Sequence, residues 1–253
     1  EQGRLDLHPL VGAYAAERLA AQAGAPAQLA QRHAEYMAGE LEGLAPHAVG
    51  DVRRLLQAVD PELANAQAAW GRALAAGRAD LAARMVRTLW AWFENRGRQR
   101  EGITLLEPGL ALPPQGSAGR LLHVRLHHGL SMLHHRIGDN LRGLAVAETG
   151  MALAETGGDV EAAIGCLLNA GTCHYEMGAP DKARALFERA LTVALERGPP
   201  QCLAWARGNL GAALTDLGRW DEAEELLRTA LAGSRAVGDH YNTAVHLINL
   251  SAL

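Results

Sequence analysis

Glycine recurs in this chain at a fixed interval, and no other feature restricts the fold as strongly. Two series, each with an interval of 40 residues, are offset from each other by 20: Gly138, Gly178 and Gly218, and Gly158, Gly198 and Gly238. Glycine just past the end of a helix adopts the left-handed conformation without steric cost. Two such glycines in each period predict two helices of about 16 or 17 residues, joined by short turns. The sequence therefore predicts a helical hairpin that repeats.

Other positions that lie 40 residues apart agree in size. Ala183 matches Ala223, and the large apolar Phe187 matches Leu227. Small residues let paired helices approach closely, while large ones fill the space between hairpins. Apolar residues make up 49% of the chain and aromatic residues only 4%, and alanine and leucine, both strong helix formers, dominate the apolar set. We expect an all-α, right-handed α-α superhelix with repeats at 118–157, 158–197 and 198–237 and a partial repeat at 238–253.

The repeat resembles the tetratricopeptide repeat. The resemblance rests on the run Asn209-Leu210-Gly211 followed by Leu214, Gly218, Ala223, Leu227 and Ala230, and on Gly171, Gly178, Ala183, Phe187 and Ala190 one period earlier. The period of 40 is longer than the usual 34 and resembles the long-helix variants of bacterial regulators and kinesin light chains. The resemblance implies a solenoid that binds partners along its concave groove.

Upstream of residue 118 the pattern is less regular. Residues 79–112 resemble a degenerate hairpin with Gly97 in its turn, and 26–44 and 61–76 are expected to be amphipathic helices. The run from Leu112 to Ser117 breaks helical periodicity and predicts a loop. We therefore interpret 23–112 as linker helices and a degenerate hairpin. The chain ends inside a first helix whose partner would follow, which leaves self-association through that helix as one expectation.

The first residues resemble a second family. The run Leu5-Asp6-Leu7-His8-Pro9-Leu10-Val11 resembles the closing helix of the winged-helix domain in STAND proteins, the signal-transduction ATPases with numerous domains. The resemblance implies that 1–22 is a winged-helix remnant and that His8 senses bound nucleotide in the parent protein. Residues 31–36, 89–90, 96–97 and 101–102 also resemble linker helices of bacterial STAND transcription regulators. The chain contains no phosphate-binding loop, so nucleotide hydrolysis would belong to another segment.

One column of asparagines is a candidate ligand-binding site. Asn169, Asn209 and Asn249 lie 40 residues apart on the helices that would line the groove. An asparagine amide offers both a donor and an acceptor, which matches the backbone groups of a bound peptide. The alternative is that each asparagine bridges adjacent hairpins and has only a structural role.

Histidines cluster in the hairpin at 118–157. His123 and His127 have the i, i+4 spacing that can chelate zinc, but no cysteine or carboxylate completes the pattern, so we expect no metal. His134 occupies the usual aromatic column and is expected in the core. The remaining basic residues are expected to face the groove and make one end of it basic, although a merely solvated face is an alternative: Arg125, His128, His135 and Arg136.

No catalytic constellation is evident, and we expect neither enzymatic activity nor a cofactor. The net charge of −4 argues against nucleic-acid binding by this fragment, and no apolar run is long enough for a membrane span. The three cysteines are expected to be free thiols in the cytoplasm. Our interpretation is a non-catalytic sensor module of a bacterial STAND-type transcriptional regulator that binds a peptide, a protein or a small-molecule effector. The alternative is a free-standing tetratricopeptide scaffold or adaptor for protein partners.

Overall fold

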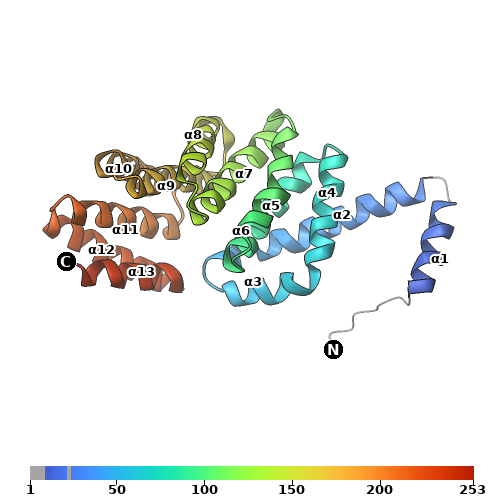
Figure 1. The fold of residues 1–253 in the computed structure, drawn as a ribbon, viewed down its shortest axis with the longest axis horizontal. Coiled ribbons are helices and arrows are strands. Elements are labelled where there is room, and N and C mark those ends of the chain that lie inside the picture. Colours follow the sequence, from blue (N-terminus) through green and yellow to red (C-terminus); the bar gives the residue numbers. More distant parts are fainter. Residues whose placement is uncertain (1–8, 22–23) are drawn as a thin grey trace.

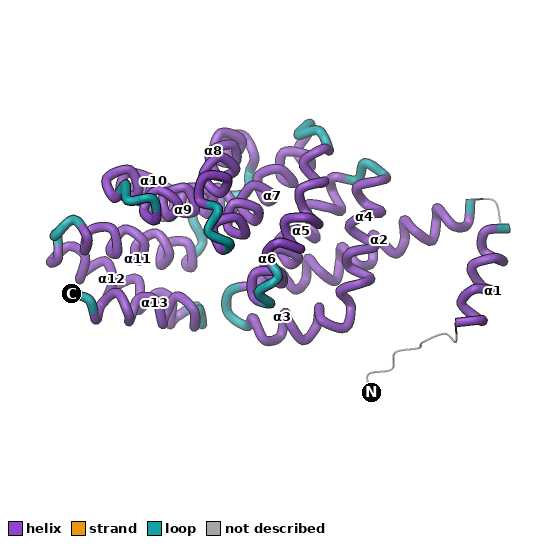
Figure 2. The backbone as a smooth tube through the Cα atoms, viewed as in Figure 1, coloured by secondary structure: helices purple, strands orange, loops and turns teal. Residues whose placement is uncertain are grey.

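The protein is a curved stack of antiparallel helices. The structure is a computed structural model, and it describes residues 9–21 and 24–253. Within these residues every regular element is a helix, and no strand is present (Figures 1 and 2). None of the described helices combines the length and the apolar character needed to cross a lipid bilayer. The predicted all-α solenoid is confirmed.

The amino-terminal half departs most from regular pairing. The predicted helices at 26–44 and 61–76 correspond to α2 and α4, whereas the short α3 was not predicted. A 3-10 turn at Glu107–Ala111, which contains Pro108, ends the second helix of the degenerate hairpin early. The helices of this half are α1 (Pro9–Ala20), α2 (Ala25–Leu44), α3 (Val52–Val59), α4 (Leu63–Ala75), α5 (Ala79–Asn95) and α6 (Gln99–Leu106).

The carboxy-terminal half consists of three helical hairpins and one further helix. First helices alternate with second helices, and each hairpin packs on the next (Figure 1). The helices are α7 (Gly116–Arg136), α8 (Asn140–Gly157), α9 (Val160–Glu176), α10 (Pro180–Arg197), α11 (Pro200–Asp216), α12 (Trp220–Ala236) and α13 (His240–Ser251). The division of the chain into 1–22, 23–112 and 118–253 stays a prediction.

The periodic glycines end helices as expected, with one exception. Gly138, Gly158, Gly178, Gly218 and Gly238 all have positive φ, between 73° and 79°. Several are followed by an aspartate that caps the next helix, for example where the carboxylate of Asp139 accepts a hydrogen bond from the backbone N–H of Arg142.

Gly198 is the exception to the left-handed turn. Its φ is −80° and its ψ is 149°, because Pro199 follows and favours an extended residue before it. A side chain would still not fit there, since a Cβ would lie 2.6 Å from the Cα of Ala194. This glycine is therefore required by close packing rather than by its backbone angles.

Within each hairpin a large side chain of the second helix packs against a glycine of the first. The Phe187 ring lies on Gly171, and the Leu227 side chain lies on Gly211. Two apolar cores follow from this packing, one extending from Ala34 to Leu133 and the other from Ile164 to Ala223. The close approach of the paired helices sets the spacing from one hairpin to the next.

Replacement of Gly171 by alanine is expected to lower the free energy of unfolding by about 1–3 kcal/mol, because the added Cβ overpacks the core. That Cβ would lie 2.4 Å from Cε1 of Phe187. The matched control is Gly71→Ala on α4, where no atom lies within 4 Å of an added Cβ and where alanine should stabilise the helix by about 0.5–1 kcal/mol. Urea unfolding measures both, and equal effects of the two substitutions would contradict this account of the hairpin.

Candidate ligand-binding cavity

The first helices of the hairpins surround a central cavity. Its volume is about 1130 Å³, and α5, α7, α9, α11 and α13 contribute most of its wall. The loop before α3 closes the remaining side, with Val49, Gly50 and Arg53 on the wall. This is slightly more than the volume typical of small-molecule sites, which range from about 300 to 1,000 Å³. The cavity is large enough to hold a small molecule or a short peptide.

The asparagine column lies along this cavity. Asn169, Asn209 and Asn249 all line it, on α9, α11 and α13 respectively. Asn209 and Asn249 are half-buried, and the amide of Asn209 donates to the carbonyl of Trp205 on its own helix at 2.9 Å. The three side chains therefore share a wall, but they do not share one hydrogen-bonding role. Their contact with a ligand stays a prediction.

Asn169 has the structural role that was the alternative. It is only 4% exposed, and its amide nitrogen donates to the Ser131 hydroxyl at 2.7 Å and to the His128 carbonyl at 3.1 Å, both on α7. These bonds join two successive hairpins. The expectation of three equivalent ligand-facing asparagines is thus corrected at this position, because the amide donors of Asn169 are already used between α9 and α7.

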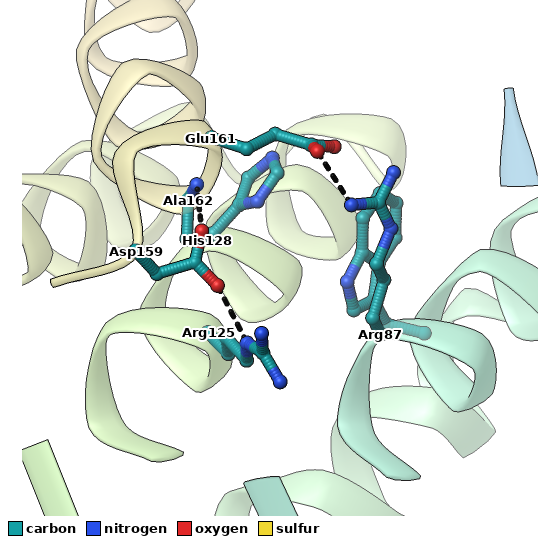
Figure 3. Close-up of a pocket in the computed structure, with 7 residues that line it drawn as sticks. Arg87, Arg125, His128, Asp159, Glu161 and Ala162 are labelled. Carbon is teal, nitrogen blue, oxygen red and sulfur yellow. Dashed lines mark hydrogen bonds and ion pairs between the residues drawn. The ribbon is translucent and has the colours of Figure 1, made fainter. Parts of the chain in front are cut away.

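Arg125 does not line the central cavity, which corrects its predicted place in the groove. Its guanidinium is fixed in a small adjoining cavity, where it donates to Asp159 at 2.6 Å and to the Ala83 carbonyl at 2.7 Å (Figure 3). Asp159 also caps α9 by accepting from the backbone N–H of Ala162. Burial alone would raise the pKa of Asp159, but these hydrogen bonds and the charge of Arg125 outweigh it and lower that pKa.

The equivalent contact recurs two repeats later with different chemistry. The indole of Trp205 donates to Asp239 at 2.7 Å, and Asp239 caps α13 by accepting from Asn242. Trp205 lies two periods after Arg125, and Asp239 two periods after Asp159. A capping aspartate that also accepts from the preceding first helix is therefore a repeated joint of this solenoid, and the arginine serves it rather than a ligand.

His128 is buried and neutral, not part of a basic groove. Its ring is tilted against Trp90, with 5.1 Å between the centroids, and it covers Gly165 of α9 (Figure 3). Burial lowers the pKa of His128 to about 4. Beside it, Arg87 of α5 forms an ion pair with Glu161 of α9 at 2.6 Å. The predicted positive charge at this position is therefore wrong.

The other two predicted basic residues do line the cavity. The guanidinium of Arg136 is paired with Glu94 at 2.8 Å and donates to the hydroxyl of Tyr241 at 3.0 Å. A ring nitrogen of His135 lies 3.1 Å from the side-chain oxygen of Asn140. Since Arg136 has a carboxylate partner, this end of the cavity has no surplus of positive charge, and the expected basic end is corrected.

The remaining histidines have partners or burial that fit a structural role. His123 contacts the Leu112 carbonyl at 2.6 Å, and His127 contacts the His123 carbonyl at 2.7 Å. His134 is 3% exposed, which confirms its predicted place in the core. Within the part of the chain that the structure describes, no group of three or more ligating side chains could hold a metal ion. His8 lies outside the described residues.

Sequence reasoning missed the wall opposite the asparagines. Trp90, Tyr175 and Tyr241 all line the cavity, as do the residues around Gly50. The tryptophan and the tyrosines do not recur at one column, so the 40-residue period gave no signal for them. The loop at Gly50 lies far from the repeats along the chain and reaches them only through the curvature of the solenoid.

Comparison with known families agrees with this architecture. A family model described as tetratricopeptide repeat matches residues 202–253, which cover α11, α12 and α13. This part of the chain is therefore a tetratricopeptide-like region. No curated protein matches the sequence.

Solved structures with a similar fold share little sequence with this chain. The structure of BtubC (BKLC) from P. vanneervenii is 18% identical, covers 80% of this chain and 82% of its own, and has a TM-score of 0.58. The MamA protein is 18% identical over 80% of this chain and 97% of its own, with a TM-score of 0.49. A thermophilic tetratricopeptide protein of Thermus thermophilus is 18% identical over 79% and 98%, with a TM-score of 0.46. The first of these supports the solenoid fold and nothing about function.

Asn169→Ala should destabilise the protein more than Asn209→Ala does. Loss of the buried inter-hairpin hydrogen bonds is expected to lower the free energy of unfolding by about 1–3 kcal/mol, whereas loss of the Asn209 bond to its own helix should cost about 0.5 kcal/mol or less. Thermal and urea unfolding of the two variants compare them directly. If Asn209→Ala were the more damaging change, the roles assigned to these two residues would be reversed.

Acidification should weaken the fold through His128. Its folded-state pKa of about 4 lies below the unfolded value of about 6.5, so the unfolded chain binds the proton first as the pH falls. Stability is therefore full above pH 6.5 and is lost between about pH 6.5 and 4, by roughly 3 kcal/mol at most. His128→Gln should flatten the pH dependence of unfolding in this window, and the exposed His240→Gln should not. Identical pH profiles for the two variants would contradict the assignment.

Proposed function

We propose that this chain is a non-catalytic binding module that takes its ligand in the central cavity. The observation that supports this most is the enclosure of about 1130 Å³ by five first helices together with the loop before α3. Solenoids of this kind recognise partners through their concave surface. Here the concave surface is curved into a cavity, which favours a ligand that fits inside it over a folded protein.

The lining favours a ligand of low net charge. The guanidinium groups of Arg87 and Arg136 are paired with Glu161 and Glu94, and His128 is neutral. A strongly charged ligand would have to compete with these partly buried ion pairs. Half-buried Asn209, Asn249 and Thr172, by contrast, offer hydrogen-bonding groups beside the apolar surface of Met132, Leu168 and Val245: these are the groups that a short peptide or a polar small molecule needs.

The proposal extends to the parent protein. We propose that the chain is the sensor arm of a bacterial STAND-type transcriptional regulator, in which effector binding biases an ATPase between two states. The resemblance of residues 5–11, 31–36 and 89–102 to that family supports this part of the proposal. A phosphate-binding loop encoded in the same gene would support it, and a gene without one would favour a free-standing scaffold that holds a protein partner.

A thermal-shift screen with a blocked cavity tests the binding function. Ala212 lines the cavity on α11, whereas Ala232 is exposed on α12. Low-molecular-mass fractions of a bacterial extract should contain a component that stabilises the native protein and the Ala232→Trp variant but not Ala212→Trp. A ligand at 100 times its Kd adds about 2.7 kcal/mol.

Two outcomes of this screen would contradict the proposal. Equal stabilisation of both tryptophan variants would place the ligand outside the cavity. Stabilisation only by the high-molecular-mass fraction would favour the scaffold alternative instead. The fractions that stabilise the native protein can then be tested on Asn209→Ala, which should lose roughly 1 kcal/mol of affinity if its amide contacts the ligand.

A further inference from the structure

The two ends of the curved solenoid meet at a seam. The loop before α3 lies on one side of the seam and the turn between α12 and α13 on the other (Figure 1). A Cβ on Gly50 would lie 3.1 Å from the carbonyl oxygen of Val237, and a Cβ on Gly238 would lie 3.8 Å from the Cα of Gly50. The absence of side chains at the two glycines lets these backbones come into contact.

One side-chain bridge crosses from the inner wall to the same end of the molecule. Arg136, at the end of α7, donates to the hydroxyl of Tyr241, at the start of α13, over 3.0 Å and a sequence separation of 105 residues. The Arg136 guanidinium also lies 5.2 Å from the centre of the Tyr241 ring, within the range of a cation–π interaction. Glu94 of α5 holds the guanidinium from the other side at 2.8 Å. The bridge thus joins three helices around the cavity.

Little else holds α13 against the amino-terminal half. The two apolar cores extend from Ala34 to Leu133 and from Ile164 to Ala223, and neither has a member on α13 among the described residues. Tyr241 itself is 58% exposed. The seam therefore lacks the apolar burial that makes the hairpins rigid, and local opening there costs less than opening a hairpin.

We infer that Arg136 and Tyr241 form a latch that holds the solenoid closed and limits the size of the ligand that reaches the cavity. Both are positioning residues, and Arg136 has this role in place of the ligand contact expected from the sequence. The inference that the latch controls ligand entry rests on the proposed function, but closure of the seam can be measured without any ligand. Failure of one is therefore distinguishable from failure of the other.

Maleimide labelling inside the cavity measures this closure. A cysteine introduced by Ala212→Cys reports access to the wall on α11, and its labelling is compared for N-ethylmaleimide and for a maleimide carried on a polyethylene glycol chain. The native thiols give a low background, because burial raises the pKa of Cys166 to about 12 and that of Cys173 to about 11, and Cys202 is fully buried as well. The protein without the added cysteine supplies that background.

With the latch intact, N-ethylmaleimide should react with Ala212→Cys much faster than the large reagent. Adding Tyr241→Ala should raise the rate of the large reagent relative to the small one by about tenfold, the change expected from loss of one hydrogen bond to a charged group. Tyr241→Phe keeps the ring over the guanidinium and should give an intermediate ratio. Tyr36→Ala, which removes a comparably exposed tyrosine on α2, should leave the ratio unchanged.

Three results would overturn the latch. The first is an unchanged ratio in Tyr241→Ala. The second is an equal acceleration of both reagents, which would mean that the substitution merely loosens the whole fold. The third is equal access of both reagents with the latch intact, which would mean that the seam is open in solution.

Discussion

The structure depends on close contact between a large side chain of one helix and a glycine of its partner. Where Phe187 lies on Gly171 and Leu227 lies on Gly211, the paired helices come close enough to bury their apolar faces. Because hairpins repeat this contact at one period, each successive hairpin is placed on the last at a similar spacing. Curvature accumulates along the stack, and it brings α13 back beside the loop before α3. The cavity is a consequence of that curvature.

Enclosure changes what the concave surface can do. Charged side chains that would face solvent in an open groove are instead paired across helices, as in Arg87 with Glu161 and Arg136 with Glu94. These pairs are partly buried, so their loss would leave an uncompensated charge near the cavity. The same residues therefore fix the positions of the helices and make the cavity close to neutral, which connects the assembly of the solenoid to the kind of ligand that we propose.

Periodicity in the sequence predicted the hairpins well, because glycine and alanine at fixed columns act locally. It predicted side-chain roles less well, since these depend on neighbours that the period does not specify. His128 looked like a groove cation, but Trp90 and Gly165 bury it, and Arg125 is held by a capping aspartate of the next hairpin. The seam had no local signal, because Arg136 and Tyr241 meet only through the accumulated curvature of the intervening hairpins. The short helix α3 was missed for want of a repeat partner.

The central claim is that the solenoid closes on itself around a cavity. The most direct measurement is the distance between spin labels on Gln57 of α3 and Ala244 of α13, both exposed, determined by double electron–electron resonance on the ligand-free protein. A closed ring predicts one narrow distribution centred on the separation of α3 and α13 in this structure. A broad distribution shifted to long distances would show an open solenoid and contradict the account.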